Sequence, residues 1–431
     1  MATGIPSSVI NHNLEGDDDL SFEISYKGKI AKEEVIQNTP TAQFNQIIDI
    51  DGGEYKSQLY FGDNLNFLKA LTNNQEVAGK VKLIYIDPPY AKKAKFSSRK
   101  QEHAYDDLLS GSKFLEFLRQ RLILMRELLA DDGSIYVHLD ETMAFPVKVI
   151  MDEVFGEQNY RNWITRKKCN PKNYTRKQYG NISDYILFYS KTKDCIFNQP
   201  FTPWDEETAK KEYNYVEEGT GRRYKKVPIH APGIRNGETG KEWKGMLPPP
   251  GKHWQYTPDK LDEMDRNGEI YWSPTGNPRR KIYLENSKGI PVQDIWMDFR
   301  DAHNQNIKIT GYPTEKNSDM LKQIILASSN EGDLVLDAFA GSGTTLAVAE
   351  ELGRKWIGID NSPLAIKTIL NRLLNGSEKM GDFVKKNKGK TIQTELLSNR
   401  ILNNGLSVYV DKNHEETFAS EINEWKAMIN G

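Results

Sequence analysis

Two short segments of the sequence combine acidic, aromatic and glycine residues at spacings that suit ligand binding. The first segment, D-A-F-A-G-S-G-T-T, begins at Asp337, follows an apolar run and precedes a helical pattern. Glycines at such a turn let the backbone approach a ligand closely, and they expose the amide groups of the helix N-terminus. No Gly-Lys-Ser/Thr sequence follows, which excludes a phosphate-binding loop. We expect this segment, with Asp337, Phe339, Gly341, Gly343, Thr344 and Thr345, to line a ligand site.

An acidic residue also lies where a dinucleotide-type fold needs one. Asp360 sits 17 positions beyond Gly343, directly after the apolar run 356–359. In such folds, an acid at the end of the second strand bonds the ribose hydroxyls of the ligand. The combination favours a ligand with a ribose and a zwitterion over a polyphosphate. A glycine turn that only packs is the alternative interpretation.

The second segment is Asp87-Pro88-Pro89-Tyr90, which follows an apolar run typical of a buried strand. Ligands of open α/β sheets bind at the carboxyl ends of strands. Two successive prolines end the strand and point the Pro88 carbonyl outward. The Asp87 carboxylate and this carbonyl would each accept one N–H of an exocyclic amino group on a planar base, while Tyr90 stacks on the ring. The alternative is a strand-ending turn with a solvated aspartate.

Strand and helix patterns alternate on both sides of the middle of the chain. Strands are expected at Gln58–Asp63, Leu83–Asp87, Ser134–Asp140, Leu334–Ala340 and Trp356–Asp360, with two more neighbouring strands at Asn162–Lys168 and Asp184–Ser190. Helices are expected at Asn64–Leu71, Ser112–Leu129, Ser318–Ser329 with Ser318 as N-cap, Thr344–Leu352 and Ser362–Leu374. This alternation predicts an α/β fold with a doubly wound, mainly parallel sheet.

The composition changes along the chain and suggests a division into domains. From residue 192 to 306, five tryptophans lie among glycines, prolines and charged residues, with a hairpin expected at Tyr271–Leu284. Most of these tryptophans are expected in the core of a small inserted domain. We therefore expect an N-terminal extension, one half of the main domain, the inserted domain, the other half and a C-terminal extension, at 1–50, 51–191, 192–306, 307–380 and 381–431.

The two chemistry-bearing segments together, with D-P-P-Y upstream of D-A-F-A-G-S-G, resemble the amino-methyltransferases of bacterial DNA in their permuted β-class order. The turn Gly62-Asp63-Asn64 and the segment G-Y-P-T-E-K, which ends at Lys316, resemble further motifs of that family. The range Trp243–Trp296 is similar to the middle segment of modification subunits of type III restriction systems. One departure is Asn317, where the family usually has proline.

The resemblance implies a Rossmann-like methyltransferase sheet with a target-recognition domain inserted at 192–306. It implies S-adenosylmethionine as methyl donor and the N6 amino group of a flipped adenine in duplex DNA as acceptor. The implied catalytic residues are Asp87, Pro88, Pro89 and Tyr90. The implied cofactor residues add Asp63, Asp87, Thr314 and Lys316 to those of the glycine-rich segment.

Several alternatives stay open at this point. Phe339 is otherwise an ordinary core aromatic, and Asp63 is otherwise a turn cap. The same groups suit the N4 amino group of cytosine, since both acceptors are aromatic amines. A catalytically silent DNA-binding subunit, or an RNA or small-molecule methyltransferase, are further alternatives. The intact D-P-P-Y and glycine-rich segments argue against the silent subunit.

Positive charge is concentrated beside the D-P-P-Y segment, although the whole chain has 58 Lys+Arg, 60 Asp+Glu and a formal net charge of −2. Residues 91–100 carry five Lys or Arg, and residues 161–193 carry nine with a single acid. DNA phosphates attract such groups, whereas a solvated surface is the alternative. We expect DNA contacts from Lys92, Lys93, Lys95, Arg99, Arg166, Lys167, Lys168 and Lys172.

Other features exclude several protein classes. No apolar run is long enough to span a membrane. The two cysteines form no C-x-x-C motif, and His230, His253 and His303 have no partner at metal-ligand spacing, so no metal is expected. We expect a cytoplasmic protein. Whether a second copy or a restriction subunit binds the chain is left open.

Overall fold

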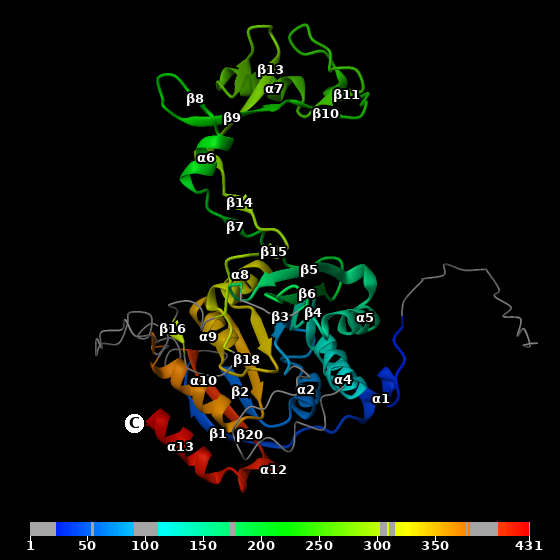
Figure 1. Ribbon diagram of the computed structural model, residues 1–431, viewed down its shortest axis with the longest axis vertical. Helices are drawn as coiled ribbons and strands as arrows, with labels where there is room; N and C mark the ends of the chain where they lie inside the picture. The colour runs from blue at the N-terminus through cyan, green and yellow to red at the C-terminus, as the bar shows by residue number, and fades with distance from the viewer. Residues whose placement is uncertain are drawn as a thin grey trace, which may run out of the picture. The chain divides into compact units, whose positions relative to one another are not determined.

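The computed structural model describes residues 23–52, 56–89, 111–171, 177–301, 308–309, 315–375, 378–379 and 404–430. The chain folds into two compact units (Figure 1). Residues Gln199–Val292 form unit 2, and the other described residues form unit 1. Unit 2 lies inside the range 192–306 in which an inserted domain is expected. Each unit is described separately below.

Unit 1 contains a ten-stranded sheet with the order β1-β20-β2-β18-β17-β3-β4-β6-β5-β15. Its central strands, from β20 to β4, are parallel, whereas β6 is antiparallel to both β4 and β5, and β1 is antiparallel to β20. This is the predicted doubly wound, mainly parallel sheet. In that spatial order the strands are Phe44–Ile50, Leu406–Asp411, Ser57–Phe61, Lys355–Asp360, Leu334–Asp337, Val81–Ile86, Leu129–Leu139, Ser183–Ser190, Tyr160–Lys167 and Ile295–Trp296.

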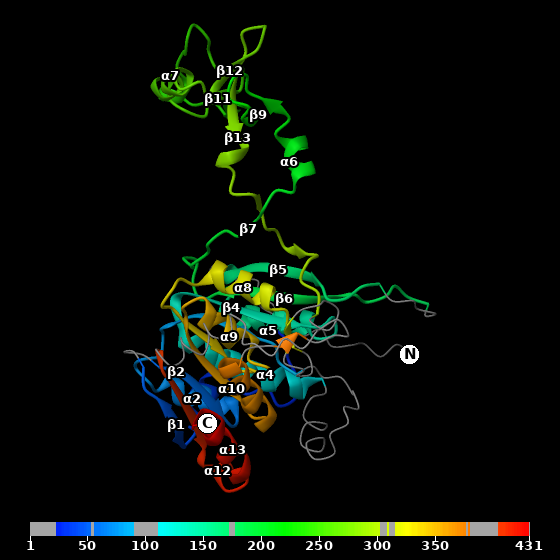
Figure 2. The same cartoon turned by 90° about the vertical axis from the view of Figure 1, so that its left-hand side faces the viewer.

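Helices cover both faces of this sheet (Figures 1 and 2). On one face, α4 contacts α1, α2 and α5; on the other, α9 contacts α8 and α10, and α10 contacts α13. Helices α1, α2, α4 and α5 span Lys32–Asn38, Asn64–Thr72, Ser112–Leu128 and Ala144–Phe155. Helices α8, α9, α10, α12 and α13 span Ser318–Ser328, Thr344–Glu351, Pro363–Asn375, Lys412–Glu415 and Ala419–Asn430. A short pairing also joins β16, Lys308–Ile309, to β19, Glu378–Lys379.

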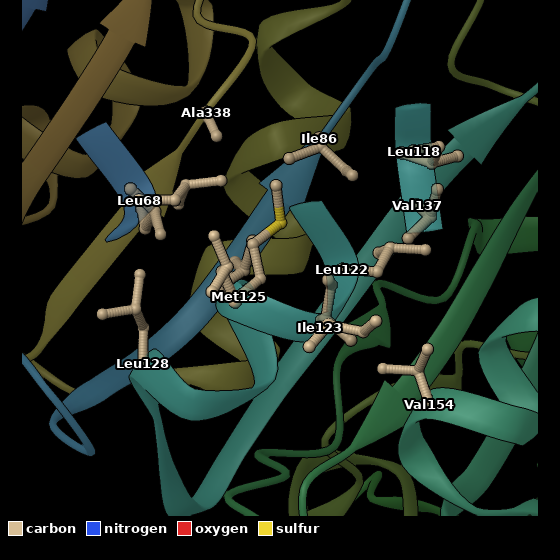
Figure 3. Packing of buried hydrophobic residues seen from close by; sticks show 14 of the residues in the cluster. Leu68, Ile86, Leu118, Leu122, Ile123, Met125, Leu128, Val137, Val154 and Ala338 are labelled. Atoms are coloured by element: carbon tan, nitrogen blue, oxygen red, sulfur yellow. The ribbon is translucent and has the colours of Figure 1, made fainter. Parts of the chain in front are cut away.

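Helix α4 supplies much of the main core. Its apolar residues recur at helical spacing, and Leu118, Leu122 and Met125 are fully buried. Figure 3 shows these side chains packed beside Ile86 of β3 and Val137 of β4. Truncating one such leucine to alanine typically costs about 2–5 kcal/mol of stability. The core therefore fixes β3, and with it the start of the D-P-P-Y segment.

Both ends of the chain contribute to the sheet, which the sequence analysis did not predict. The first 50 residues are expected to be an irregular extension, but β1 lies at the sheet edge within them. Residues 381–431 are likewise expected to be an extension, but β20 lies between β1 and β2. Trp425 of α13 is also fully buried. The pattern of apolar residues in a six-residue strand is too short to show whether the strand is paired on one side or on both.

Unit 2 is built around a four-stranded antiparallel sheet with the order β12-β13-β9-β8. The predicted hairpin is present as β12 and β13, with Trp272 opposite Pro278. Trp243 and Trp254 are buried, as expected, beside Leu261 and Met264 of α7. The strands β7 to β14 span Phe201–Thr202, Tyr215–Val216, Arg223–Pro228, His230–Pro232, Lys252–Trp254, Ile270–Trp272, Pro278–Tyr283 and Ile290–Pro291. Helices α6 and α7 span Glu206–Glu212 and Pro258–Arg266.

Candidate active site

The carboxyl ends of β3, β17 and β18 place three aspartates along one edge of the sheet. The strands are parallel neighbours, with Leu336 opposite Ile84 and Asp337 opposite Gly358. Asp337 is the last residue of β17, Asp360 is the last residue of β18, and Asp87 follows β3 directly. Two of the predicted cofactor residues are thus brought to the same edge as the predicted catalytic aspartate.

The electrostatics of Asp337 report this proximity. Burial, together with the negative charges of Asp87 and Asp360, raises the pKa of Asp337 to about 7. Hydrogen bonds from Thr345 and from the Phe339 backbone N–H, the latter at 3.0 Å, act in the opposite direction without cancelling this shift. A cationic group bound at this edge would relieve the repulsion among the carboxylates.

The glycine-rich turn connects β17 to α9 in a conformation that needs glycine. Gly341 and Gly343 have φ angles of 51° and 72°, in the left-handed region. A Cβ atom on Gly343 would also lie 2.7 Å from Cγ1 of Ile369. The Gly341 N–H donates to Oδ2 of Asp360 at 2.8 Å, so the turn and the end of β18 are joined directly.

Asp360 is held by backbone amides. Its Oδ1 accepts from the Ser362 N–H at 2.8 Å, Gly341 binds its other oxygen, and the Asn361 N–H is a further donor. Burial nevertheless raises the pKa of Asp360 above its ordinary value. Each carboxylate oxygen can accept more than one hydrogen bond, so Asp360 retains the capacity to accept ribose hydroxyls.

Both threonines after the turn are buried, and their hydroxyls bind protein groups. Thr345 bonds the Asp337 carboxylate, while the Thr344 hydroxyl lies 3.0 Å from the Ser342 hydroxyl and accepts from Arg372 at 3.0 Å. Arg372 also donates to the Ser342 carbonyl at 3.2 Å. These contacts support the shape of the turn.

Three consecutive residues, Glu315-Lys316-Asn317, contact several parts of the site. Glu315 is buried and forms an ion pair of 2.9 Å with Arg372, the residue that holds the glycine-rich turn. The Nζ of Lys316 lies 2.9 Å from Oδ2 of Asp87. This short segment therefore joins the predicted cofactor turn to the predicted catalytic turn.

Asn317 is buried and begins α8. Its side-chain oxygen accepts from the N–H groups of Asp319 and Met320 at 2.9 and 3.1 Å, and its amide nitrogen donates to the Arg300 carbonyl at 3.0 Å. The predicted N-cap Ser318 is therefore wrong by one residue, since Ser318 is the first helical residue. Asparagine is a strong N-cap, which explains how a residue other than proline serves at this position.

The turn Gly62-Asp63-Asn64 contacts the same region. Asp63 caps α2 by accepting from the Leu65 N–H at 2.7 Å, and its Oδ1 lies 3.0 Å from Arg121. Buried Asn64 donates to the Ala338 carbonyl at 2.7 Å. Asp63 is thus the helix cap that the alternative interpretation describes, and its implied contact with the cofactor stays a prediction.

Phe339 is only partly buried, and its ring contacts the ring of Phe117. Its ring centroid lies 6.1 Å from that of Phe117, and the Arg121 guanidinium stacks 3.5 Å from the Phe117 ring centroid. Phe339 therefore lies at the carboxyl end of β17, two residues after Asp337. Pro88 is buried and Pro89 is half-buried.

The prediction that Arg166 contacts DNA is contradicted by its burial. Its side chain is 0% exposed, and its guanidinium binds Asp184 at 3.0 Å and Asp301 at 2.5 Å. It also donates to the Phe299 carbonyl at 2.6 Å. Lys167 and Lys168, its neighbours in the basic tract, are half-buried. A charged run in sequence does not reveal which of its members turns inward.

Arg166 ends a buried polar network that spans four strands. The His138 Nε2 lies 3.0 Å from Oδ2 of Asp184 without an aligned hydrogen bond, and the Tyr85 hydroxyl lies 2.8 Å from the other ring nitrogen. Burial alone would raise the pKa of Asp184, but its contacts with His138 and Arg166 hold it well below its usual range. Burial also lowers the pKa of His138. Tyr85, the member of this network on β3, lies two residues before Asp87.

Seven predicted residues lie outside the described part of the chain: Tyr90, Lys92, Lys93, Lys95, Arg99, Lys172 and Thr314. The sequence patterns in turn assigned no supporting role to several residues that hold the site, namely Asn64, Arg121, Glu315, Asn317 and Arg372. Asn64, Glu315 and Asn317 adjoin residues already selected. Arg372 offered a signal too, because it lies next to buried Leu373 on an amphipathic helix.

The donor set fits S-adenosylmethionine, which carries a sulfonium and an ammonium charge. Three carboxylates at one edge suit a cation, Asp360 suits a ribose, and the Phe339 ring suits a flat or apolar group. Among the described residues, no cluster of three or more His, Cys, Asp or Glu side chains is arranged to hold a metal ion. Within the same residues, no helix has the length and apolar character that a membrane span requires.

Comparison with known proteins agrees with this chemistry. The profile of a family described as DNA methylase matches residues 81–371. The chain is 54% identical over 338 residues to the type II methyltransferase M.EcaI of Enterobacter cloacae, which covers 77% of this chain and 74% of that protein. It is 29% identical to the StyLTI Mod subunit of Salmonella typhimurium over 334 residues, which covers 68% of this chain but 50% of that subunit.

Solved structures with a similar course of the chain include the M1.HpyAVI complex with S-adenosylmethionine. That similarity has a TM-score of 0.41 and 17% identity, and it covers 73% of this chain and 98% of the other. The match to the DNA methylase profile includes both the D-P-P-Y segment and the glycine-rich turn. The chain therefore belongs to the DNA methylase family.

Proposed function

We propose that this protein transfers a methyl group to the N6 amino group of adenine in duplex DNA. The methyl donor of the family is S-adenosylmethionine, which supplies an electrophilic methyl group on a sulfonium. The observation that carries the proposal is the position of Asp87 and Pro88 at the carboxyl end of β3. They lie beside the edge formed by Asp337 and Asp360. An acceptor bound at Asp87 would thus lie next to a donor bound at that edge.

The role proposed for Asp87 follows from the chemistry of aromatic amines. The lone pair of such an amine is conjugated with the ring, which makes the nitrogen a poor nucleophile. Hydrogen bonds from its two protons to the Asp87 carboxylate and the Pro88 carbonyl would increase electron density on nitrogen. They would also favour a pyramidal nitrogen aligned for in-line attack. Orientation and fixed electrostatics would supply most of the rate acceleration.

Lys316 is proposed to act on Asp87 rather than on the acceptor. An ammonium 2.9 Å from Oδ2 would fix the orientation in which the carboxylate accepts one N–H of the base. The pair is mostly buried, with the Asp87 and Lys316 side chains 18% and 13% exposed. A carboxylate fixed in this way keeps a defined orientation toward the amine.

A base inside a duplex is out of reach of this edge, so the target adenine must leave the stack. We propose that Tyr90, which follows Pro89, stacks on the flipped base. Lys167 and Lys168 are proposed to contact phosphates near this site. Unit 2 is proposed as the recognition unit for the DNA sequence, in keeping with the similarity of residues 243–296 to type III modification subunits.

The product nucleoside tests the proposal directly. Duplex DNA containing many sequences is incubated with the protein and S-adenosylmethionine that carries a radiolabelled methyl group, and the DNA is digested to nucleosides. The label is expected in N6-methyladenosine. Label in N4-methylcytosine would overturn the choice of base, and transfer to no DNA while the cofactor still binds would favour a catalytically silent subunit.

A further inference from the structure

One face of the unit 2 sheet combines tyrosines with basic side chains. The register places Lys281 opposite Lys226 and Tyr283 opposite Tyr224. It also places Tyr271 opposite Arg279 and Tyr215 opposite Tyr224. Residues directly opposite on neighbouring strands point to the same side of a sheet. We call this side the Tyr–Lys face; its cations are Lys226, Arg279 and Lys281, and its tyrosines are Tyr215, Tyr224, Tyr271 and Tyr283.

The other side of the same sheet faces the core of unit 2. Ile270 lies on that side and packs in one cluster with Trp243 and with Leu261 and Met264 of α7. Trp272, two residues after Ile270, stacks on Trp243 with the ring centroids 5.4 Å apart. The side with Ile270 and Trp272 therefore packs on α7 and the tryptophans, and the Tyr–Lys face is the opposite side.

The three cations of the Tyr–Lys face differ in their partners. The Nζ of Lys226 lies 3.6 Å from the ring centroid of Tyr215 and 3.4 Å from that of Tyr271. Lys281 is paired with Glu217 at 2.8 Å. Within the described ranges, no carboxylate lies at ion-pair distance from Lys226 or from exposed Arg279. Lys226 is thus held by rings that do not neutralise its charge, and Arg279 adds a second cation without a carboxylate partner in that part of the chain.

We infer that the Tyr–Lys face binds the sugar–phosphate backbone of duplex DNA. Charge complementarity selects this partner, because uncompensated cations bind phosphates, and the phosphate contacts of a protein set its position on the duplex. The rings argue against an unpaired strand as the main ligand. Tyr224 and Tyr283 are buried, and the Lys226 ammonium lies over the rings of Tyr215 and Tyr271, so the rings hold cations instead of stacking on bases.

This inference rests on the proposed function only in taking DNA as the partner of unit 2. It adds which face of the unit makes the contact and which residues carry it. It further assigns these residues to positioning on the backbone, not to the choice of base sequence, because backbone contacts carry no sequence information directly.

The test compares the full-length protein with the double variant Lys226→Gln/Arg279→Gln in binding to a fluorescent duplex at several salt concentrations. At about 0.1 M salt, we expect the dissociation constant to rise about tenfold or more, and the slope of log K against log salt to fall by about 2. The matched control, Lys241→Gln/Lys260→Gln, removes two exposed lysines of the same unit that pair with Glu238 and Glu263. It should bind like the parent protein.

Unchanged affinity and salt slope in the double variant would overturn the inference, as would an equal loss in the control. Lys226→Arg should retain the slope of the parent, and unchanged binding of S-adenosylmethionine by the double variant shows that unit 1 is intact. The two proposals fail separately. A loss of affinity without any methylation of adenine counts against the proposed function alone. Normal methylation with unchanged affinity of the double variant counts against the Tyr–Lys face alone.

Discussion

Lys316 and Asp87 are joined by an ion pair of 2.9 Å, although they lie on segments far apart in the sequence. The residues on either side of Lys316 are themselves fixed: Glu315 pairs with Arg372, and Asn317 caps α8. Lys316 thus reaches Asp87 from an anchored backbone. The position of the Asp87 carboxylate is consequently linked to the glycine-rich turn that Arg372 supports.

Removing the ammonium of Lys316 should slow methyl transfer without weakening DNA binding. In Lys316→Met, the Asp87 carboxylate loses the partner that orients it, and we expect the single-turnover rate constant to fall about 10- to 100-fold. The control is Lys322→Met, a half-exposed lysine of α8 that pairs with Glu351. A variant that transfers methyl groups at the parent rate would exclude a positioning role for Lys316.

A side chain at Gly343 should destabilise the protein more than one at another glycine with positive φ. Gly332→Ala, at φ 84° with open space around it, should cost about 1–2 kcal/mol for its backbone alone. Gly343→Ala adds a contact with Ile369 at 2.7 Å, and we expect roughly 1–3 kcal/mol more from overpacking. Urea denaturation measures both free energies of unfolding. Equal losses of unfolding free energy in the two variants would show that the Ile369 side chain moves away without an energetic cost.

Asp337 should make the protein less stable as the pH rises from about 4 to 7. Its folded pKa of about 7 lies above the ordinary value of 3.8, so the folded state holds a proton that the unfolded state releases in this range. Stability from this group is full below the unfolded pKa and is lost as the pH approaches the folded one. Asp337→Asn should therefore gain stability relative to the parent across this window, with no further change above it.

The comparison with Asp319→Asn controls for the loss of one carboxylate, because Asp319 is exposed on the first turn of α8. Thermal unfolding is followed at a series of pH values for all three proteins. If the difference between Asp337→Asn and the parent stays constant from pH 4 to 7, the carboxyl of Asp337 does not titrate as described.

Arg166 should affect stability and leave the salt dependence of DNA binding unchanged. In Arg166→Met, the buried Asp184 loses a cation, and breaking a buried ion pair on one side costs about 3–5 kcal/mol. Arg161→Met on the same strand should cost less, since the partners of Arg161 among the described residues are the Ser190 hydroxyl and backbone carbonyls. If folded Arg166→Met showed a weaker salt dependence of DNA binding than the parent, Arg166 would be a phosphate contact after all.

The sequence predicted the parts of the site that are contiguous. Asp87-Pro88-Pro89 and the turn from Asp337 to Gly343 each place their groups by local geometry, and the parallel sheet then brings the strand ends together. The ion pairs Lys316–Asp87 and Glu315–Arg372 were not predicted, because each joins segments that meet only in the folded chain.

Burial was the other property that sequence patterns did not give. Arg166 lies in a basic tract that resembles a surface, yet it is held inside by Asp184 and Asp301. Likewise, the pattern of Leu406–Asp411 does not show that the strand is paired on both sides by β1 and β2. Both outcomes depend on partners supplied from other parts of the chain.

The role of Asp87 is tested most directly by one comparison between the parent protein and Asp87→Ala. Transfer of a radiolabelled methyl group from S-adenosylmethionine to duplex DNA is measured in a single turnover, with DNA affinity measured on the same samples. We predict that transfer by Asp87→Ala falls to background, because the amine loses the carboxylate that accepts one of its two hydrogen bonds. DNA affinity should stay close to that of the parent. Methyl transfer retained by Asp87→Ala would contradict the assignment of this turn as the catalytic centre.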